Sequence, residues 1–232
     1  MVKKIILLNV FIWIFFVKII QGFILDSNLV FKYFGLAPGP MFENFLFWQP
    51  VTYMFLHSGS LFHILLNMFM LWMLGSELEK KWGSKFFLKY YLICGVGSAL
   101  IYSLVFFVAQ FFYSSLSVFN ISVVGASGSI FGLLAAYGML FKNRIIFFML
   151  IFPMKAKNLV LLLAGIEIFN LLDNGLGGHT ANLSHLGGLL VGFLYLKMLY
   201  LKPKNTAKKT ARFGNKHLRL VEDDLNKQET WH

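Results

Sequence analysis

The chain has 232 residues, of which 58% are hydrophobic and only 13% are charged, and its mean hydropathy is +0.69. Soluble globular proteins average about 45–50% apolar and about 25% charged residues, so this composition excludes an ordinary soluble enzyme or binding domain. Apolar runs long enough to cross a hydrocarbon core of about 30 Å recur along the chain. They lack the short alternating pattern of a membrane β-barrel, so we predict an all-α, polytopic membrane protein.

A net charge of +11 would suggest a nucleic-acid partner in a soluble protein. Here most basic residues flank hydrophobic segments, which indicates membrane topology and contact with anionic membrane lipids, and no nucleic acid. The single cysteine, Cys94, lies in an apolar run and has no partner for an internal disulfide. We expect it to be a small core residue.

Six apolar segments are candidate membrane spans. We place them at residues 5–24, 61–78, 86–112, 124–141, 159–172 and 183–201, with part of 145–152 as a membrane-dipping approach to the fifth. The first follows Lys3 and Lys4, as in a signal peptide, but no small-residue cleavage site follows, so we expect a retained helix. The predicted architecture is a six-helix membrane domain over residues 1–201, followed by a basic, largely disordered cytoplasmic tail over 202–232.

The distribution of lysine and arginine predicts the orientation of these spans. Basic residues lie before the first span, around the junctions of the second with the third and of the fourth with the fifth, and at the end of the sixth: Lys3, Lys4, Lys80, Lys81, Lys85, Lys89, Lys142, Arg144, Lys155, Lys157 and Lys197. Only Lys18 and Lys32 fall on the other side. Both termini are therefore expected to be cytoplasmic.

Polar residues near the outer ends of three spans share one predicted depth. Counted from the cytoplasmic charges at about 1.5 Å per residue, Ser127 lies roughly 22 Å, His63 roughly 21 Å and His185 roughly 18 Å into the membrane core. Three segments far apart in sequence thus converge several ångströms below the outer surface. The uncharged stretch over residues 113–123 is expected to dip into the protein, because non-helical backbone at this depth needs protein or water around it.

Ser127 and His185 are the residue types that nucleophilic catalysis needs, because a serine hydroxyl becomes reactive when a base takes its proton. Taken alone, Ser127 would more often be a small polar contact between helices, and His185 a histidine hydrogen-bonded to a neighbouring helix. Gly125 and Gly128 frame the serine, allow close approach of a substrate and leave the amides at the helix start free. No acidic residue lies in the fourth or sixth span, so we predict a Ser127–His185 dyad without a carboxylate.

On these residues the chain resembles the rhomboid family of intramembrane serine proteases from about Trp48 to Gly192. The matching motifs follow one another in order: Trp48-Gln49, Thr52, Phe55-Leu56-His57, His63-Ile64-Leu65-Leu66-Asn67, Glu79, Trp82-Gly83-Ser84, Gly125-Ala126-Ser127-Gly128, Phe131-Gly132, Pro153-Met154-Lys155-Ala156-Lys157, His185-Leu186-Gly187-Gly188 and Gly192. A glycine-framed serine is a weak signal, whereas the ordered set is specific. The chain departs from the family pattern at Gln49, where the best-known members carry arginine, and at Ser184, where alanine is usual.

The resemblance implies roles for residues around the dyad. Phe131 lies one turn after Ser127, where the family places an aromatic ring on the base; plain packing is the alternative. His63 and Asn67 share a helix face and could join the Ser127 amide in an oxyanion hole; the alternative is a structural polar pair between helices.

Small residues recur every fourth position on the fourth and sixth spans, at Gly128, Gly132 and Ala136 and at Gly188 and Gly192. Such faces let helix backbones approach closely. We expect this contact to bring the serine and the histidine within hydrogen-bond reach.

Glu167 is an acidic residue in the fifth span, and it has two interpretations. It could be a proton-relay residue of a transporter, or a polar contact within the bundle, with Asn170 as a candidate partner; the family motif Gly165-Ile166-Glu167 favours the second. The resemblance also places the fifth span at a lateral substrate entrance, with Phe169 and Leu172 as gate residues. His57 is expected to be a loop or interface residue and His179 a loop residue near the outer rim, neither with a catalytic role.

We therefore expect an intramembrane serine protease that hydrolyses a peptide bond in or near a transmembrane helix of a client membrane protein. No metal and no organic cofactor are implied. A catalytically silent relative that binds membrane helices would lack the serine or the histidine, and a small transporter would favour an internal repeat, which this chain does not have. We expect the bacterial inner (cell) membrane, while the client, the cleavage preference and the oligomeric state stay open.

Overall fold

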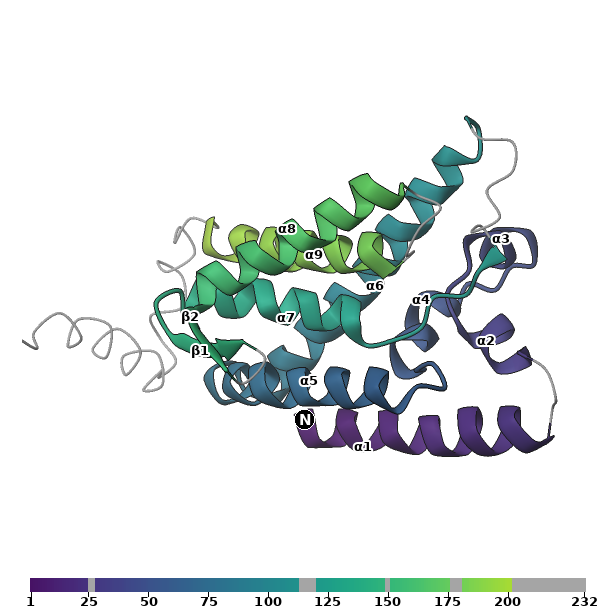
Figure 1. The fold of residues 1–232 in the computed structure, drawn as a ribbon, viewed down its shortest axis with the longest axis horizontal. Coiled ribbons are helices and arrows are strands. Elements are labelled where there is room, and N and C mark those ends of the chain that lie inside the picture. The colour runs from purple at the N-terminus through teal and green to yellow at the C-terminus, as the bar shows by residue number, and fades with distance from the viewer. Residues whose placement is uncertain (25–27, 113–119, 149–150, 176–180, 202–232) are drawn as a thin grey trace, which may run out of the picture. The chain divides into compact units, whose positions relative to one another are not determined.

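Long apolar helices make up most of the chain in the computed structural model, which describes residues 1–24, 28–112, 120–148, 151–175 and 181–201 (Figure 1). The first helix comprises α1 (Val2–Ile12) and a π-helical continuation, η1 (Trp13–Ile24). The others are α5 (Leu61–Trp82), α6 (Ser84–Ala109), α7 (Ser127–Leu140), α8 (Ala156–Asn174) and α9 (Ala181–Leu201). The predicted all-α membrane bundle is confirmed.

Four of these helices are long and apolar enough to cross a membrane: Val2–Ile24, Leu61–Trp82, Ser84–Ala109 and Ala181–Leu199. Helix α7 is apolar but has only 14 residues. Helix α8 has 19 residues, of which Lys157, Glu167 and Asp173 are charged. All six helices lie where spans were predicted, and the count of six complete crossings stays a prediction.

The chain between the first two long helices folds into short helices instead of an extended loop. These are α2 (Leu29–Phe34), α3 (Pro38–Glu43), α4 (Gln49–Thr52) and η2 (Tyr53–Phe55). Gln49 is buried and connects two parts of this segment by hydrogen bonds. Its Oε1 accepts from the Ala37 N–H at 3.0 Å, and its Nε2 donates to the Lys32 carbonyl at 3.1 Å. The amide at this position therefore holds this segment, residues 28–60, together.

Helix α7 lies at the centre of the bundle, and nine of its 14 residues are buried. The non-helical backbone before it pairs with the segment over residues 28–60, since Leu36 and Val123 exchange two backbone hydrogen bonds of 2.9 and 2.8 Å. The Gly125 N–H donates to the Tyr53 carbonyl at 3.0 Å. The described part of the predicted dip, residues 120–123, is thus held by a protein partner at Val123.

The connection between α7 and α8 differs from the prediction. Residues 145–152 were expected to approach the fifth span as a membrane-dipping segment, but Ile145–Phe148 forms strand β1, which pairs antiparallel with β2 (Phe152–Lys155). The run of isoleucine and phenylalanine favours a strand and is too short for a helical span. Arg144, just before β1, forms an ion pair of 2.8 Å with Glu77 of α5.

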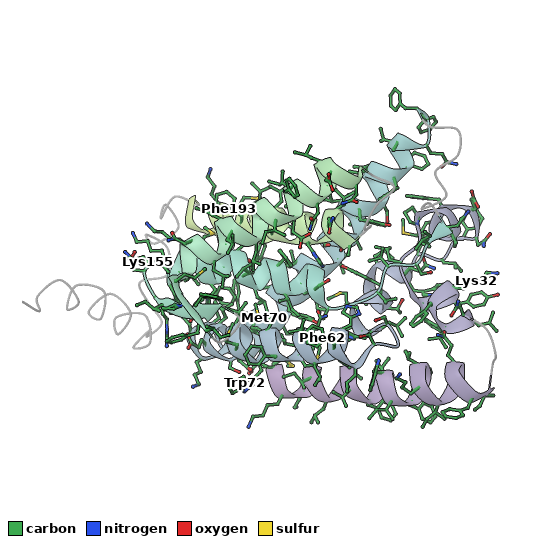
Figure 2. The ribbon with its side chains drawn as sticks, viewed as in Figure 1. Lys32, Phe62, Met70, Trp72, Lys155 and Phe193 are labelled. Carbon is green, nitrogen blue, oxygen red and sulfur yellow. The ribbon has the colours of Figure 1, made fainter. Side chains whose placement is uncertain are left out.

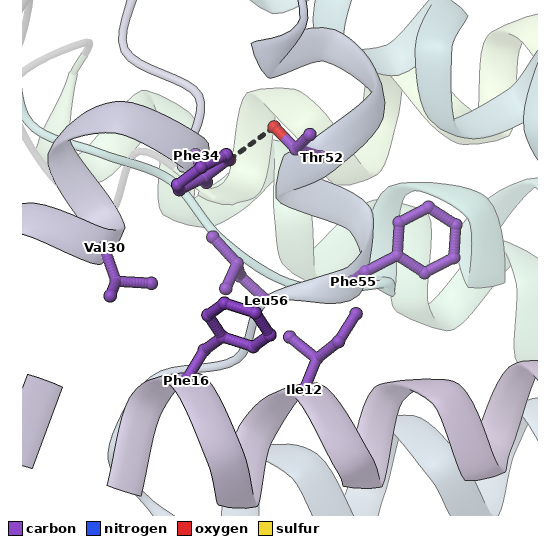
Figure 3. Close-up of a pocket in the computed structure, with 7 residues that line it drawn as sticks. All are labelled: Ile12, Phe16, Val30, Phe34, Thr52, Phe55 and Leu56. Atoms are coloured by element: carbon purple, nitrogen blue, oxygen red, sulfur yellow. Dashed lines mark hydrogen bonds between the residues drawn. The ribbon is translucent and has the colours of Figure 1, made fainter. Parts of the chain in front are cut away.

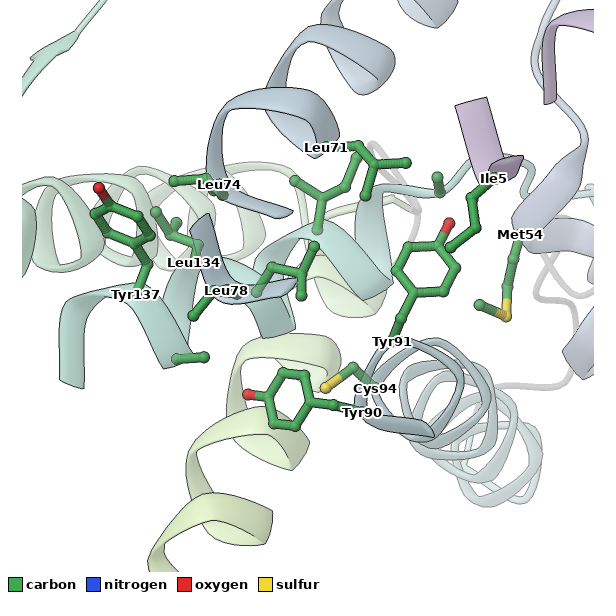
Figure 4. Close-up of a cluster of buried hydrophobic side chains, with 14 of the residues drawn as sticks. Ile5, Met54, Leu71, Leu74, Leu78, Tyr90, Tyr91, Cys94, Leu134 and Tyr137 are labelled. Carbon is green, nitrogen blue, oxygen red and sulfur yellow. The ribbon is translucent and has the colours of Figure 1, made fainter. Parts of the chain in front are cut away.

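The buried core follows the contacts of α5, α6 and α7. Leucines of α5 meet the tyrosines of α6 and the apolar face of α7 (Figure 4). Cys94 lies fully buried in this cluster, as expected. Large apolar side chains such as Phe62 and Trp72 of α5 and Phe193 of α9 are exposed instead (Figure 2), as in helices that face lipid.

Residues 1–196 form one compact unit. The predicted tail over 202–232, the stretch 113–119 and His179 lie outside the described residues.

Candidate active site

Glycines bring α7 and α9 into backbone contact. A Cβ atom on Gly188 would lie 1.9 Å from the Gly128 carbonyl oxygen, and one on Gly192 would lie 2.9 Å from the Cα of Gly132. Only residues without a side chain allow this approach. The close packing expected from the small-residue repeats is confirmed.

This backbone contact between α7 and α9, the α7–α9 seam, places Ser127, the first residue of α7, beside His185 in the second turn of α9. The Ser127 Oγ lies 2.7 Å from the His185 Nε2, well within hydrogen-bond distance. The Phe131 ring stacks on the imidazole with a centroid distance of 4.4 Å and an interplanar angle of 6°. Both residues of the pair are partly exposed.

Gly125 lets a second histidine approach the serine. Its φ of +133° is one that residues with side chains rarely adopt. A Cβ here would lie 3.1 Å from the His63 Nε2 and 3.7 Å from the Ser127 Oγ. His63 of α5 therefore faces the start of α7 across this glycine.

The contacts of His63 define its tautomer. The Ser58 backbone N–H donates to its Nδ1 at 3.3 Å, and the Ser58 Oγ lies 2.9 Å from the same nitrogen. Because a backbone N–H can only donate, Nδ1 accepts, and in the neutral ring Nε2 carries the proton. This proton is directed to the side of Gly125 and Ser127, where the first amides of α7 also lack helical partners. An oxyanion at this point would meet several N–H donors.

Asn67 lies one turn below His63 and is 7% exposed. Its Nδ2 donates to the His63 carbonyl at 2.9 Å, which uses one of its two N–H groups. His57 lies in the loop before α5, in agreement with the expected loop or interface position, and packs against His63 with ring centroids 5.2 Å apart. Burial, and then the nearby His63, lower the pKa of His57 to about 3, so this neighbour is uncharged at neutral pH.

The carboxylate of Glu167 corrects the expectation of a histidine without an acidic partner. Its Oε1 lies 2.9 Å from the His185 Nδ1, and the two side chains are 12% and 18% exposed. The expected contact with Asn170 is wrong: the Asn170 carbonyl accepts from the Asn174 side chain, and Glu167 instead crosses from α8 to α9. The fourth and sixth spans carry no acid, but the fifth supplies one.

Sequence reasoning also missed the residues beneath the pair. The Ser98 Oγ of α6 donates to the Ser184 carbonyl at 2.5 Å and lies 2.8 Å from the Ser184 Oγ. Both serines are fully buried. The departure from alanine at Ser184 therefore adds a hydrogen bond between α6 and α9, directly before His185.

A separate apolar cavity of about 210 Å³ lies between the first helix and the segment over residues 28–60 (Figure 3). It is lined by Ile12, Phe16, Val30, Phe34 and Leu56, among others, and contains no titratable side chain. This cavity therefore offers no acid–base group, in contrast to the contact between α7 and α9. No group of three histidine, cysteine or acidic residues in the described ranges is arranged to hold a metal ion.

Comparison with known proteins gives the family. The Rhomboid domain model matches residues 44–202. The chain belongs to the rhomboid family. This rhomboid chain is 34% identical to RHOMBOID-like protein 1 of Arabidopsis thaliana, over 68% of its own length and 36% of the relative's.

Two further relatives are named as proteases. Rhomboid protease GluP of Bacillus subtilis (strain 168) is 29% identical over 81% of the rhomboid chain and 32% of GluP. Rhomboid-like protease 2 of Toxoplasma gondii is 28% identical over 63% of the rhomboid chain and 45% of that relative. The chain thus spans roughly a third to a half of the length of these relatives. The residues that match the Rhomboid domain, 44–202, include both the serine and the histidine.

Proposed function

We propose that this rhomboid-family protein is an intramembrane serine endopeptidase in which Ser127 is the nucleophile and His185 the general base. The observation that carries the proposal is the 2.7 Å contact between the Ser127 Oγ and the His185 Nε2. A serine and a histidine at this distance in a glycine-framed helix start meet the geometric requirement for an activated nucleophile. The relatives named as proteases support the same reaction.

The proposed reaction is acyl transfer in two halves. As the Ser127 Oγ bonds to the client's carbonyl carbon, its proton moves to the His185 Nε2 and the carbonyl electron pair becomes an oxyanion. Breakage of the C–N bond follows, and the imidazolium gives its proton to the leaving amine. Water then attacks the acyl-enzyme in the same way and releases the carboxylic acid and free Ser127.

The proposed clients are transmembrane proteins. A client helix must unwind locally, because an intact helix hides its carbonyl carbons; small or helix-breaking residues near the scissile bond would ease this. Phe169 and Leu172 of α8 are 66% and 79% exposed, which suits residues beside the path of a client helix. The cytoplasmic termini and the bacterial inner membrane are part of the same proposal.

The decisive test uses the purified full chain in lipid bilayers with a panel of single-span substrates. We expect cleavage in or near the membrane segment and its loss after treatment with an alkyl fluorophosphonate, with the adduct on Ser127 by peptide mass spectrometry. A silent helix-binding relative would retain substrates without cutting them and without forming the adduct. Cleavage that continues in fully labelled protein would contradict the proposal.

The oxyanion hole makes a separate prediction. His63→Ala should lower kcat by about 10²–10³-fold with a smaller rise in KM, because an oxyanion donor acts mainly in the transition state. Asn67→Ala should also lower kcat more than it raises KM, but less than His63→Ala, since part of its amide already serves the His63 carbonyl. The measurement pairs steady-state kinetics with melting temperature on the same preparations. An activity loss fully explained by a lower melting temperature would leave Asn67 as a scaffold residue.

A further inference from the structure

We infer that Glu167 is a positioning residue that holds His185 in the tautomer able to accept the Ser127 proton, so that the site works as a Ser127–His185–Glu167 triad. This inference rests on the proposed function, because a tautomer matters for catalysis only if His185 is the base. It differs from the dyad that the sequence led us to expect.

The three groups form one continuous line of contacts across three helices. The Glu167 Oε1 of α8 lies 2.9 Å from the His185 Nδ1, and the opposite nitrogen, Nε2, lies 2.7 Å from the Ser127 Oγ. The Phe131 ring covers one face of the imidazole. With both nitrogens and one face engaged, the imidazole has little freedom to turn away from the serine.

The chemistry of the carboxylate selects the useful tautomer. An ionised carboxylate only accepts hydrogen bonds, so the His185 Nδ1 must carry the proton and Nε2 must present its lone pair to the serine. The same negative charge favours the imidazolium that forms when Ser127 gives up its proton. Without this partner, the ring is free to adopt the other tautomer, in which Nε2 carries a proton and cannot act as a base.

A simple helix-to-helix contact is the alternative, and the surroundings of Glu167 argue against it. An acidic side chain among apolar helices is costly to retain. Its other oxygen, Oε2, is buried and has no hydrogen-bond partner among the described residues, so the group is poorly satisfied as a structural link. Its one ion-pair partner in the described ranges is His185. These features fit a group retained for what it does to the histidine.

Few other titratable groups face this pair. Helix α7 carries no charged residue, and α9 carries none before Lys197. The α5 helix contributes His63, which is close enough to interact electrostatically with His185. On α8, Asp173 lies six residues beyond Glu167, about 9 Å along the axis, and is exposed. Asp173→Asn therefore removes an equal charge from the same helix and is the matched control.

The kinetic test compares Glu167→Gln with Asp173→Asn in the full chain. Glu167→Gln should lower kcat by about 10²–10⁴-fold with KM within about twofold, since loss of the carboxylate of a catalytic histidine has effects of this size. Asp173→Asn should match the wild type. Unchanged kcat in a stable Glu167→Gln preparation would overturn the inference.

A second readout needs no turnover and keeps the two proposals apart. With ¹⁵N-histidine labelling in bicelles, and His185→Ala to assign the signal, the wild-type His185 should be protonated on Nδ1, whereas Glu167→Leu should lose this preference. The same tautomer in both proteins would overturn the role of Glu167 even if Ser127 cleaves clients. A carboxylate-dependent tautomer in a protein that is never labelled on Ser127 would instead support the positioning of His185 by Glu167 and contradict the proposed protease activity.

Discussion

Ser127→Ala is expected to abolish cleavage of a transmembrane substrate, with kcat lower by about 10⁶-fold, the loss seen when a serine protease loses its nucleophile. His185→Ala should cost about as much, because the hydroxyl 2.7 Å away then has no base. The double substitution should be no worse than either single one, since residues that act as a unit are not additive. The measurement is single-turnover cleavage in bilayers at saturating enzyme.

Ser129→Ala is the matched control for the nucleophile. Ser129 lies two residues further along α7, is fully buried, and donates to the Tyr91 carbonyl at 2.9 Å. Losing this bond should lower the melting temperature modestly, because a net hydrogen bond contributes about 1 kcal/mol, while kcat stays near the wild-type value. If His185→Ala kept more than about a tenth of the rate, a loss of only about 1.4 kcal/mol, the dyad would have to be abandoned.

The helices and their order could be predicted from the sequence because the membrane simplifies the problem. Hydropathy marks each helix, and small residues every fourth position mark the faces in contact. Depth then relates distant residues, which is why the sequence alone is enough to pair Ser127 with His185. The structure places these two side chains in hydrogen-bond contact.

Glu167 could not be paired with His185 from the helices that carry the serine and the histidine, because the acid lies on a third helix. Helical depth does relate the two residues. Glu167 lies seven residues before the end of α8, and His185 lies four residues after the start of α9, so both are roughly 6–11 Å from these two helix ends. The pairing of strand Ile145–Phe148 with strand Phe152–Lys155 was missed for another reason, since short apolar runs do not distinguish strand from helix.

Contacts made by the backbone could not be predicted from the sequence. The pairing of Leu36 with Val123 and the bond from Ser58 to His63 depend on where loops meet, and no side-chain pattern encodes that. The glycine at position 125 was recognised as permissive, but its positive φ and its approach to His63 came only with the fold.

Gly188→Ala is expected to have the largest effect of any single added methyl group on α9. A Cβ at this position would lie 1.9 Å from the Gly128 carbonyl oxygen, so a backbone must move and α9 must shift away from α7. The shift displaces His185, three residues earlier, from Ser127. A misplacement of about 1 Å can cost about 10² in rate, so kcat should fall at least that far, together with the melting temperature.

Two further glycines separate misplacement from general overpacking. Gly192→Ala adds a methyl group one turn further from the dyad, where it meets the Tyr90 hydroxyl at 2.5 Å and Gly132 at 2.9 Å. Overpacking of this kind costs about 1–3 kcal/mol, so we expect a similar loss of melting temperature but a smaller loss of kcat. Gly165→Ala on α8 meets no atom within 4 Å, so kcat should stay unchanged and the melting temperature should not fall, since alanine favours a helix over glycine. If Gly188→Ala retained full kcat, the distance between α7 and α9 would not control the Ser127–His185 contact, and the proposed reason for the glycine seam would be wrong.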